Sequence, residues 1–127
     1  MRKHAQRSLA LLALTLLACT PTYSSLDVYP LDGDGEVVGN TIELEEGHAM
    51  VVHVRPVSTG YPSYEDFDIV SLESRSPTIA FAEGAREIDE FVIGGVSVGT
   101  ARITVSVNGR DEDELVVEVV AQQESAP

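Results

Sequence analysis

A strand-and-turn pattern in residues 91–119 limits what this chain can fold into more than any other feature. Apolar and polar residues alternate in its middle: Ala101, Ile103, Val105 and Val107 are separated by Arg102, Thr104 and Ser106. A period of two residues is typical of a β-strand with one buried face. The turn sequence Asn108-Gly109 follows at once, and Leu115, Val117 and Val119 repeat the alternation. The stretch therefore predicts two strands of an antiparallel β-domain joined by a tight turn.

The rest of the chain reads as further short strands around this pair. Apolar runs bounded by Gly, Pro or acidic residues predict strands at 26–29, 41–44, 49–54, 69–72, 78–81 and 88–93. Residues 31–40, with three glycines and three acids, are predicted to form a loop. With 127 residues there is room for one small domain. We expect an all-β fold, an Ig-like antiparallel β-sandwich of about seven strands over residues 26–121, with a disordered tail at 122–127.

The first residues have the pattern of a secretory leader. The basic residues Arg2, Lys3 and Arg7 precede an apolar run at 9–18 that only Thr15 interrupts. A permanent membrane helix needs about 20 apolar residues, so this run is too short to remain in the bilayer. The pattern therefore predicts a signal peptide at 1–18 that is removed from the mature protein.

The end of this leader resembles a bacterial lipoprotein precursor. Leu16, Leu17 and Ala18 precede Cys19, the one cysteine of the chain, in the order of a lipobox. The resemblance implies that Cys19 is lipidated, for example with palmitate, and becomes the first residue of a short tether at 19–25. Thr20 at the next position implies sorting to the outer membrane of the cell envelope. The alternative is an ordinary secretory signal with an incidental cysteine.

The charge of the mature chain excludes whole classes of partner. Three of the eight basic residues lie in the leader, so five arginines face 21 acidic residues, a net charge of −16. Such a chain is repelled by nucleic acid and by anionic lipid headgroups. We therefore expect no nucleic acid partner, and membrane attachment only through the lipid on Cys19. A single cysteine allows no disulfide within the chain.

Residues 26–121, and their second half most closely, resemble the group 2 bacterial immunoglobulin-like (Big) domains. The similarity lies in Val70-Ser71-Leu72-Glu73-Ser74-Arg75-Ser76-Pro77-Thr78-Ile79-Ala80, in residues 93–96 and in Gly99-Thr100-Ala101-Arg102-Ile103-Thr104-Val105. The resemblance implies an Ig-like sandwich, and such domains occur in adhesins, enzyme appendages and envelope proteins. We expect a non-enzymatic, lipid-anchored envelope protein whose Ig-like domain is an interaction or structural module, with an envelope protein as its partner.

One motif could suggest an enzyme. Residues 95–99 fit G-x-S-x-G, the nucleophile elbow of α/β-hydrolases, with Ser97 as the nucleophile. That elbow needs a strand that turns into a helix, whereas the residues after Gly99 are predicted to form a strand. We expect these glycines to join two strands, and no catalytic residue.

Two acidic sets form the alternative hypothesis, a calcium-binding structural domain. Asp32, Asp34 and Glu36 have calcium-loop spacing, with Asn40 and Glu43 at later ligand positions, but Val37 occupies the glycine position. The second set, with Asp111 and Asp113, follows the Asn108-Gly109 turn. Solvated surface is the competing interpretation of both sets, so we expect no cofactor unless it is calcium.

Aromatic residues in the predicted loop 56–68 are the candidates for partner binding. Tyr61, Tyr64 and Phe67 occur there among serine, glycine and acidic residues. Tyr, Ser and Gly together are a composition suited to protein recognition. In an Ig-like sandwich this loop shares one end with the connections at 83–89 and 108–114.

Overall fold

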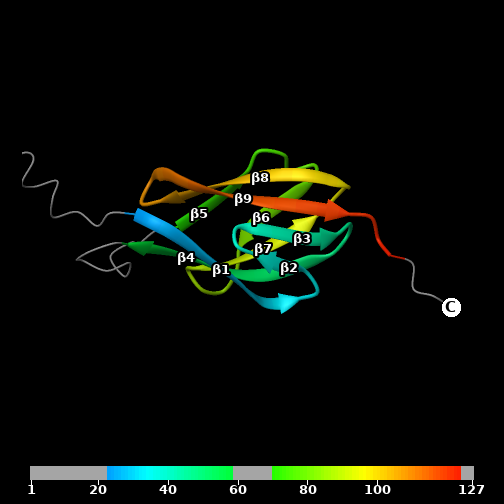
Figure 1. Ribbon diagram of the computed structural model, residues 1–127, viewed down its shortest axis with the longest axis horizontal. Helices are drawn as coiled ribbons and strands as arrows, with labels where there is room; N and C mark the ends of the chain where they lie inside the picture. The colour runs from blue at the N-terminus through cyan, green and yellow to red at the C-terminus, as the bar shows by residue number, and fades with distance from the viewer. Residues whose placement is uncertain (1–22, 59–69, 124–127) are drawn as a thin grey trace, which may run out of the picture.

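The computed structural model describes residues 23–58 and 70–123, whose regular structure is entirely β-strand. Nine strands follow one another there: β1 (Tyr23–Gly33), β2 (Glu36–Val38), β3 (Thr41–Glu45), β4 (Ala49–Ser58), β5 (Val70–Ser74), β6 (Ala80–Gly84), β7 (Glu90–Gly95), β8 (Gly99–Val107) and β9 (Arg110–Val120). They form a four-stranded sheet in the order β1-β4-β7-β6, called sheet A, and a five-stranded sheet in the order β2-β3-β9-β8-β5, called sheet B. The two sheets pack face to face (Figure 1).

This strand order confirms the predicted β-sandwich. Sheet A has the order of strands A, B, E and D of an Ig constant-type domain, and β9-β8-β5 has the order of strands G, F and C. Two details of the prediction were wrong. The described chain has nine strands rather than about seven, and β3 runs parallel to β9, so the sandwich is not wholly antiparallel.

The acidic, glycine-rich stretch after β1 explains both differences. Residues 31–40 were predicted to be a loop, but β1 extends to Gly33 and β2 occupies Glu36–Val38. β1 lies in sheet A, whereas β2 and β3 lie in sheet B. The stretch therefore carries the chain from one sheet to the other, which places β3 beside β9. Gly33 permits the crossing, because it has φ +101° and a Cβ there would come within 2.8 Å of the backbone of Ala49 and Met50.

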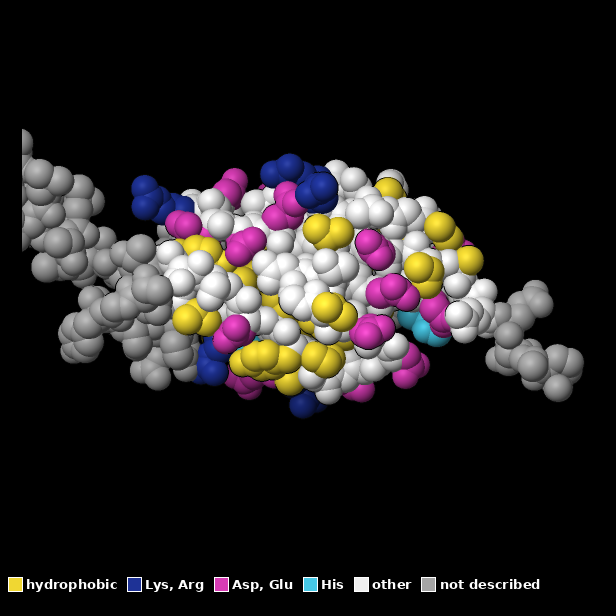
Figure 2. Space-filling view, viewed as in Figure 1, with side chains coloured by type: hydrophobic (Ala, Val, Ile, Leu, Met, Phe, Trp, Pro, Cys, Tyr) yellow, Lys and Arg dark blue, Asp and Glu magenta, His cyan; other side chains and the backbone are white. Residues whose placement is uncertain are grey.

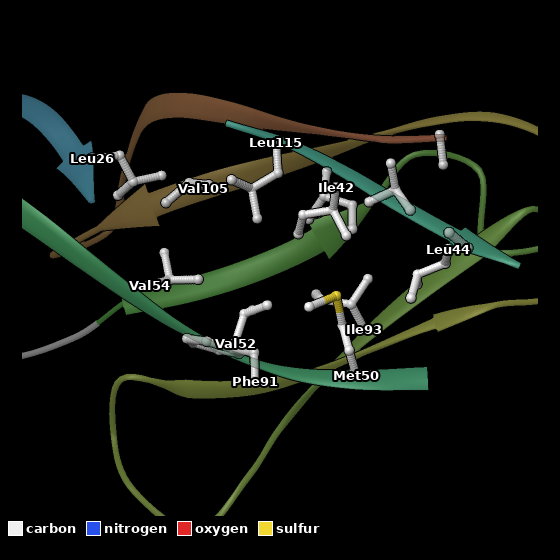
Figure 3. Close-up of a cluster of buried hydrophobic side chains, with 14 of the residues drawn as sticks. Leu26, Ile42, Leu44, Met50, Val52, Val54, Phe91, Ile93, Val105 and Leu115 are labelled. Atoms are coloured by element: carbon white, nitrogen blue, oxygen red, sulfur yellow. The ribbon is translucent and has the colours of Figure 1, made fainter. Parts of the chain in front are cut away.

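The core lies between the two sheets and is built from the alternating apolar residues. Figure 3 shows side chains of sheet A, among them Met50, Val52 and Ile93, pointing toward Ile42, Leu44, Val105 and Leu115 of sheet B. No polar or charged side chain is buried in the part of the chain that the structure describes. The period-2 pattern of residues 101–119 therefore places its apolar half in this core, as predicted.

The turn between β8 and β9 has the expected tight geometry. Asn108 has φ 49° and Gly109 has φ 83°, the left-handed conformations that a two-residue type I′ hairpin requires. β9 runs from this turn to the opposite end of the sandwich, where the described chain ends at Gln123. The first and last described residues therefore lie at opposite ends (Figure 1). No helix within residues 23–58 or 70–123 is long and apolar enough to cross a membrane.

Candidate functional site

A hydrogen-bond network closes the sandwich at the end where β1 begins. Tyr23 Oη donates to Asp113 Oδ2 at 2.6 Å, and Asn40 Nδ2 donates to Asp113 Oδ1 at 3.3 Å. The backbone N–H of Glu114 also donates to Oδ1, at 2.8 Å. Burial raises the pKa of the Tyr23 phenol above its ordinary value of 10.0, and the hydrogen bond to Asp113 and nearby negative charge raise it further. The network joins β1, the β2–β3 turn and β9.

Two other acids of the last hairpin, Asp111 and Glu114, contact side chains outside β9. Ser106 Oγ donates to Asp111 Oδ1 at 2.6 Å, and Glu114 forms an ion pair with Arg102. Arg75 Nη1 of the segment after β5 lies 3.9 Å from Glu114 Oε2. The side chains of Asp111 and Asp113 thus hold protein donors in this structure.

Asp32 of the first acidic set and Asp113 of the second lie far apart. Asp32 is near the end of β1, where its Oδ1 accepts the N–H of Gly33 at 2.8 Å, and Glu36 begins β2. Asp32 is nine positions along β1 from Tyr23, which contacts Asp113, and nine strand positions span roughly 30 Å. Among the described residues no group of three or more His, Cys, Asp or Glu could hold a metal ion. The calcium hypothesis therefore stays a prediction without a geometric site in this part of the chain.

Ser97 lies in the connection between β7 and β8 and has a structural partner. Its Oγ donates to the carbonyl of Thr78 at 2.7 Å, and the carbonyl of Ile79 accepts the N–H of Val96 at 2.7 Å. Strand β8 begins at Gly99, where a nucleophile elbow would have a helix. The G-x-S-x-G match therefore serves as a link between two strands.

The outer face of sheet A is a surface that the sequence analysis missed. One row of paired residues crosses all four strands, Asp32 to Val51, Val51 to Val92, and Val92 to Glu83. Its apolar middle is therefore bordered by a carboxylate on each edge strand. Figure 2 shows apolar side chains close to acidic ones along the lower edge of the view, where β1 runs in Figure 1, with Lys or Arg side chains beside them.

Neighbouring rows on this face are also partly apolar. In one row Tyr29 stacks on His53 with ring centroids 5.1 Å apart, and His53 Nε2 lies 3.8 Å from Asp89 Oδ2. In the other row the ring of Phe81 covers Gly94, because a Cβ on Gly94 would lie 2.2 Å from that ring. Sheet A thus presents a partly apolar outer face in addition to the face that it buries.

This face contains an open hollow of about 150 Å³. Its lining residues come from β1, β4 and β7: Asp32, Gly33, Ala49, Met50, Val51 and Val92. The sequence does carry a signal for this face, since residues 50–52 and 91–93 are continuous apolar runs rather than alternating ones. Such runs are typical of strands that are covered on both faces.

The remaining predicted site residues lie outside the described ranges. These are Cys19 for lipidation and Tyr61, Tyr64 and Phe67 for partner binding. Their roles stay predictions.

No family model and no curated protein matches this sequence. Among solved structures the chain is similar to domains 1–6 of the surface layer protein SbsC, with a TM-score of 0.60 and 17% identity over 84% of this chain. Domains 5–6 of the S-layer protein SbsC give a TM-score of 0.56 with 18% identity over 84% of this chain. The chain spans 14% and 48% of those two chains, respectively. At these identities the similarity shows a shared fold.

Proposed function

We propose that this chain is a lipid-anchored, non-enzymatic protein of the bacterial cell envelope that acts as an interaction or structural module. The observation that carries the proposal is the position of Tyr23, four residues after Cys19 in sequence and bonded to Asp113 at one end of the sandwich. Four residues span at most about 14 Å, so a lipid on Cys19 holds this end of the domain close to the bilayer. The shared fold with a surface layer protein supports a structural role outside the cytoplasm.

This arrangement also orients the domain. β9 leads from the anchored end to the far end, which carries the β7–β8 connection and Gln123. The strands of sheet A run between these two ends. The outer face of the sheet is therefore roughly perpendicular to the membrane surface, where a neighbouring protein can reach it. The residue after Cys19 is Thr20, and this supports sorting of the lipoprotein to the outer membrane.

Substitution of Cys19, the residue that would carry the lipid, tests the anchor. Wild type should partition into the detergent phase and carry the mass of a diacylated or triacylated Cys19, because one acyl chain alone binds membranes only marginally. Cys19→Ser should remain uncleaved or appear in the aqueous phase, while the matched control Thr20→Ser should behave as wild type. Density-gradient fractionation of the membranes tests the outer-membrane assignment. Unmodified wild type recovered entirely from the aqueous phase would contradict the proposal.

A further inference from the structure

The hollow on sheet A has the size and lining of a side-chain pocket. Its volume of about 150 Å³ compares with cavities that hold a benzene-sized group. Val51 and Val92 are half-buried and form its apolar wall, and Ala49 adds a small apolar side chain. One aromatic or branched aliphatic side chain from outside therefore fits its volume and chemistry.

The charges around the hollow select the partner. Asp32 and Glu83 stand at the two ends of the row that contains Val51 and Val92. Three strand spacings separate them, about 14 Å. Glu90 lies beside His53 in the next row and adds a third carboxylate. Cationic side chains on both sides of an apolar one would match this pattern, whereas a second copy of this acidic chain would bring like charges together.

From this geometry we infer that the outer face of sheet A docks a basic segment of another protein, which inserts one apolar side chain beside Val51 and Val92 and places Lys or Arg near Asp32 and Glu83. This inference deepens the interaction role proposed above and rests on it. Such a complex would account for the apolar residues on both faces of β4 and β7, because the partner would bury the outer face while sheet B buries the inner one.

Two synthetic peptides test the docking. One alternates Lys and Thr with a single Phe at its centre, and the other has Ser in place of Phe. Isothermal titration of the purified protein should show the Phe peptide binding about tenfold or more tightly than the Ser peptide, because the hollow buries the ring. In Val51→Thr/Val92→Thr the ratio should fall to about twofold or less, since Thr keeps the β-branched shape and removes apolar surface.

Matched variants separate docking from plain charge attraction. Val98→Thr, on the 57% exposed Val98 of the β7–β8 connection, should keep the full ratio. Val92→Asp adds negative charge to the face. Charge attraction alone would therefore increase the affinity of both peptides, whereas docking of the Phe ring in the hollow predicts a lower affinity for the Phe peptide. Asp32→Asn/Glu83→Gln should weaken both peptides more than two neutralisations on sheet B, Glu73→Gln/Glu118→Gln.

Three results would overturn the inference. Equal binding of both peptides to wild type would show that the hollow takes no side chain. If Val98→Thr lowered the ratio of Phe-peptide to Ser-peptide affinity as much as Val51→Thr/Val92→Thr does, the peptide would bind somewhere other than the hollow. Self-association of wild type that Val51→Thr/Val92→Thr abolishes would make the occupant a second copy. Melting curves confirm that each variant is folded, and Val92→Thr alone replaces the double variant if that one unfolds. Loss of the lipid anchor leaves the peptide result unchanged, so the two proposals fail separately.

Discussion

At the residue scale, Tyr23 and Asp113 show how one contact ties together distant parts of the chain. They are 90 positions apart, and their bond fixes the start of β1 against β9 of the other sheet. Asp113 holds three donors at once, from Tyr23, Asn40 and Glu114. A carboxylate with three hydrogen-bond donors from three segments of the chain stabilises the way those segments meet.

Replacing Tyr23 by Phe should change the pH dependence of stability. The raised pKa means that folded Tyr23 keeps its proton at pH values where the unfolded chain loses it, so its contribution is complete below about pH 10 and is lost as the pH rises above that value. Tyr23→Phe should lower the free energy of unfolding at pH 7 by about 1 kcal/mol. It should also reduce the decline in stability above about pH 10. Urea denaturation across the alkaline range measures both effects, and Tyr29→Phe, which leaves the Tyr23–Asp113 bond in place, should retain the decline.

The two strand glycines Gly84 and Gly94 should respond oppositely to alanine. A Cβ at Gly94 would overlap the ring of Phe81, whereas a Cβ at Gly84 meets nothing within 4 Å. Gly94→Ala should therefore cost about 1–3 kcal/mol through displacement of that ring. Gly84→Ala should be neutral or stabilise by up to about 1 kcal/mol, because it restricts the unfolded chain. Thermal melting compares the two, and equal effects would mean that the contact with Phe81 is unimportant.

At the element scale, the crossing from β1 to β3 gives the sandwich its only parallel pair among the described strands. β3 pairs with β9 from Thr41 with Val116 to Glu45 with Val120. β2 forms the outer edge of the same sheet with three residues. β3 is therefore an inner strand that contributes Ile42 and Leu44 to the core, and β2 protects its free edge.

Alanine substitutions should separate these two roles. Ile42 is fully buried, whereas Val38 of β2 is 67% exposed. Ile42→Ala should lower the free energy of unfolding by about 2–5 kcal/mol because it leaves a cavity between the sheets. Val38→Ala should change it by less than about 0.5 kcal/mol. A chemical denaturation curve for each variant provides the comparison, and a small loss for Ile42→Ala would show that β3 contributes little to the core energy.

At the scale of the whole molecule, the long-range electrostatic interaction is repulsion between the many acidic side chains. The full sequence has 8 basic and 21 acidic residues, a net charge of −13, and only a few of these acids have cationic partners in the described chain. Repulsion of this kind acts across the surface and is screened by salt. The Debye length falls from about 10 Å at 0.1 M to about 3 Å at 1 M salt.

The melting temperature should therefore rise with NaCl concentration. Calcium chloride at equal ionic strength should give the same rise, because the described acids do not converge on a cation site. An excess stabilisation by calcium would support the calcium hypothesis. Asp32→Asn/Asp34→Asn and Asp111→Asn/Asp113→Asn would then show which acidic set is responsible. A melting temperature that is flat or falls with NaCl would mean that the acids are already compensated.

The sequence by itself determined the features that depend on neighbours along the chain. Alternation in residues 101–119 decided which side chains enter the core, and Asn108-Gly109 decided the turn, because strand faces and left-handed turns are local properties. The acid excess likewise follows from composition. The loop predicted at residues 31–40 was wrong: glycines and acids suggested it, but β1 extends to Gly33 and pairing with β3 forms the strand β2.

Only the tertiary structure decided which distant residues meet. The crossing at Gly33 placed β3 parallel to β9, and the register of four strands aligned Asp32, Val51, Val92 and Glu83 in one row. These positions belong to four separate strands, so no local pattern relates them. Their order across the sheet follows from which strands pair and with which register, and that choice is made when the two apolar faces pack together.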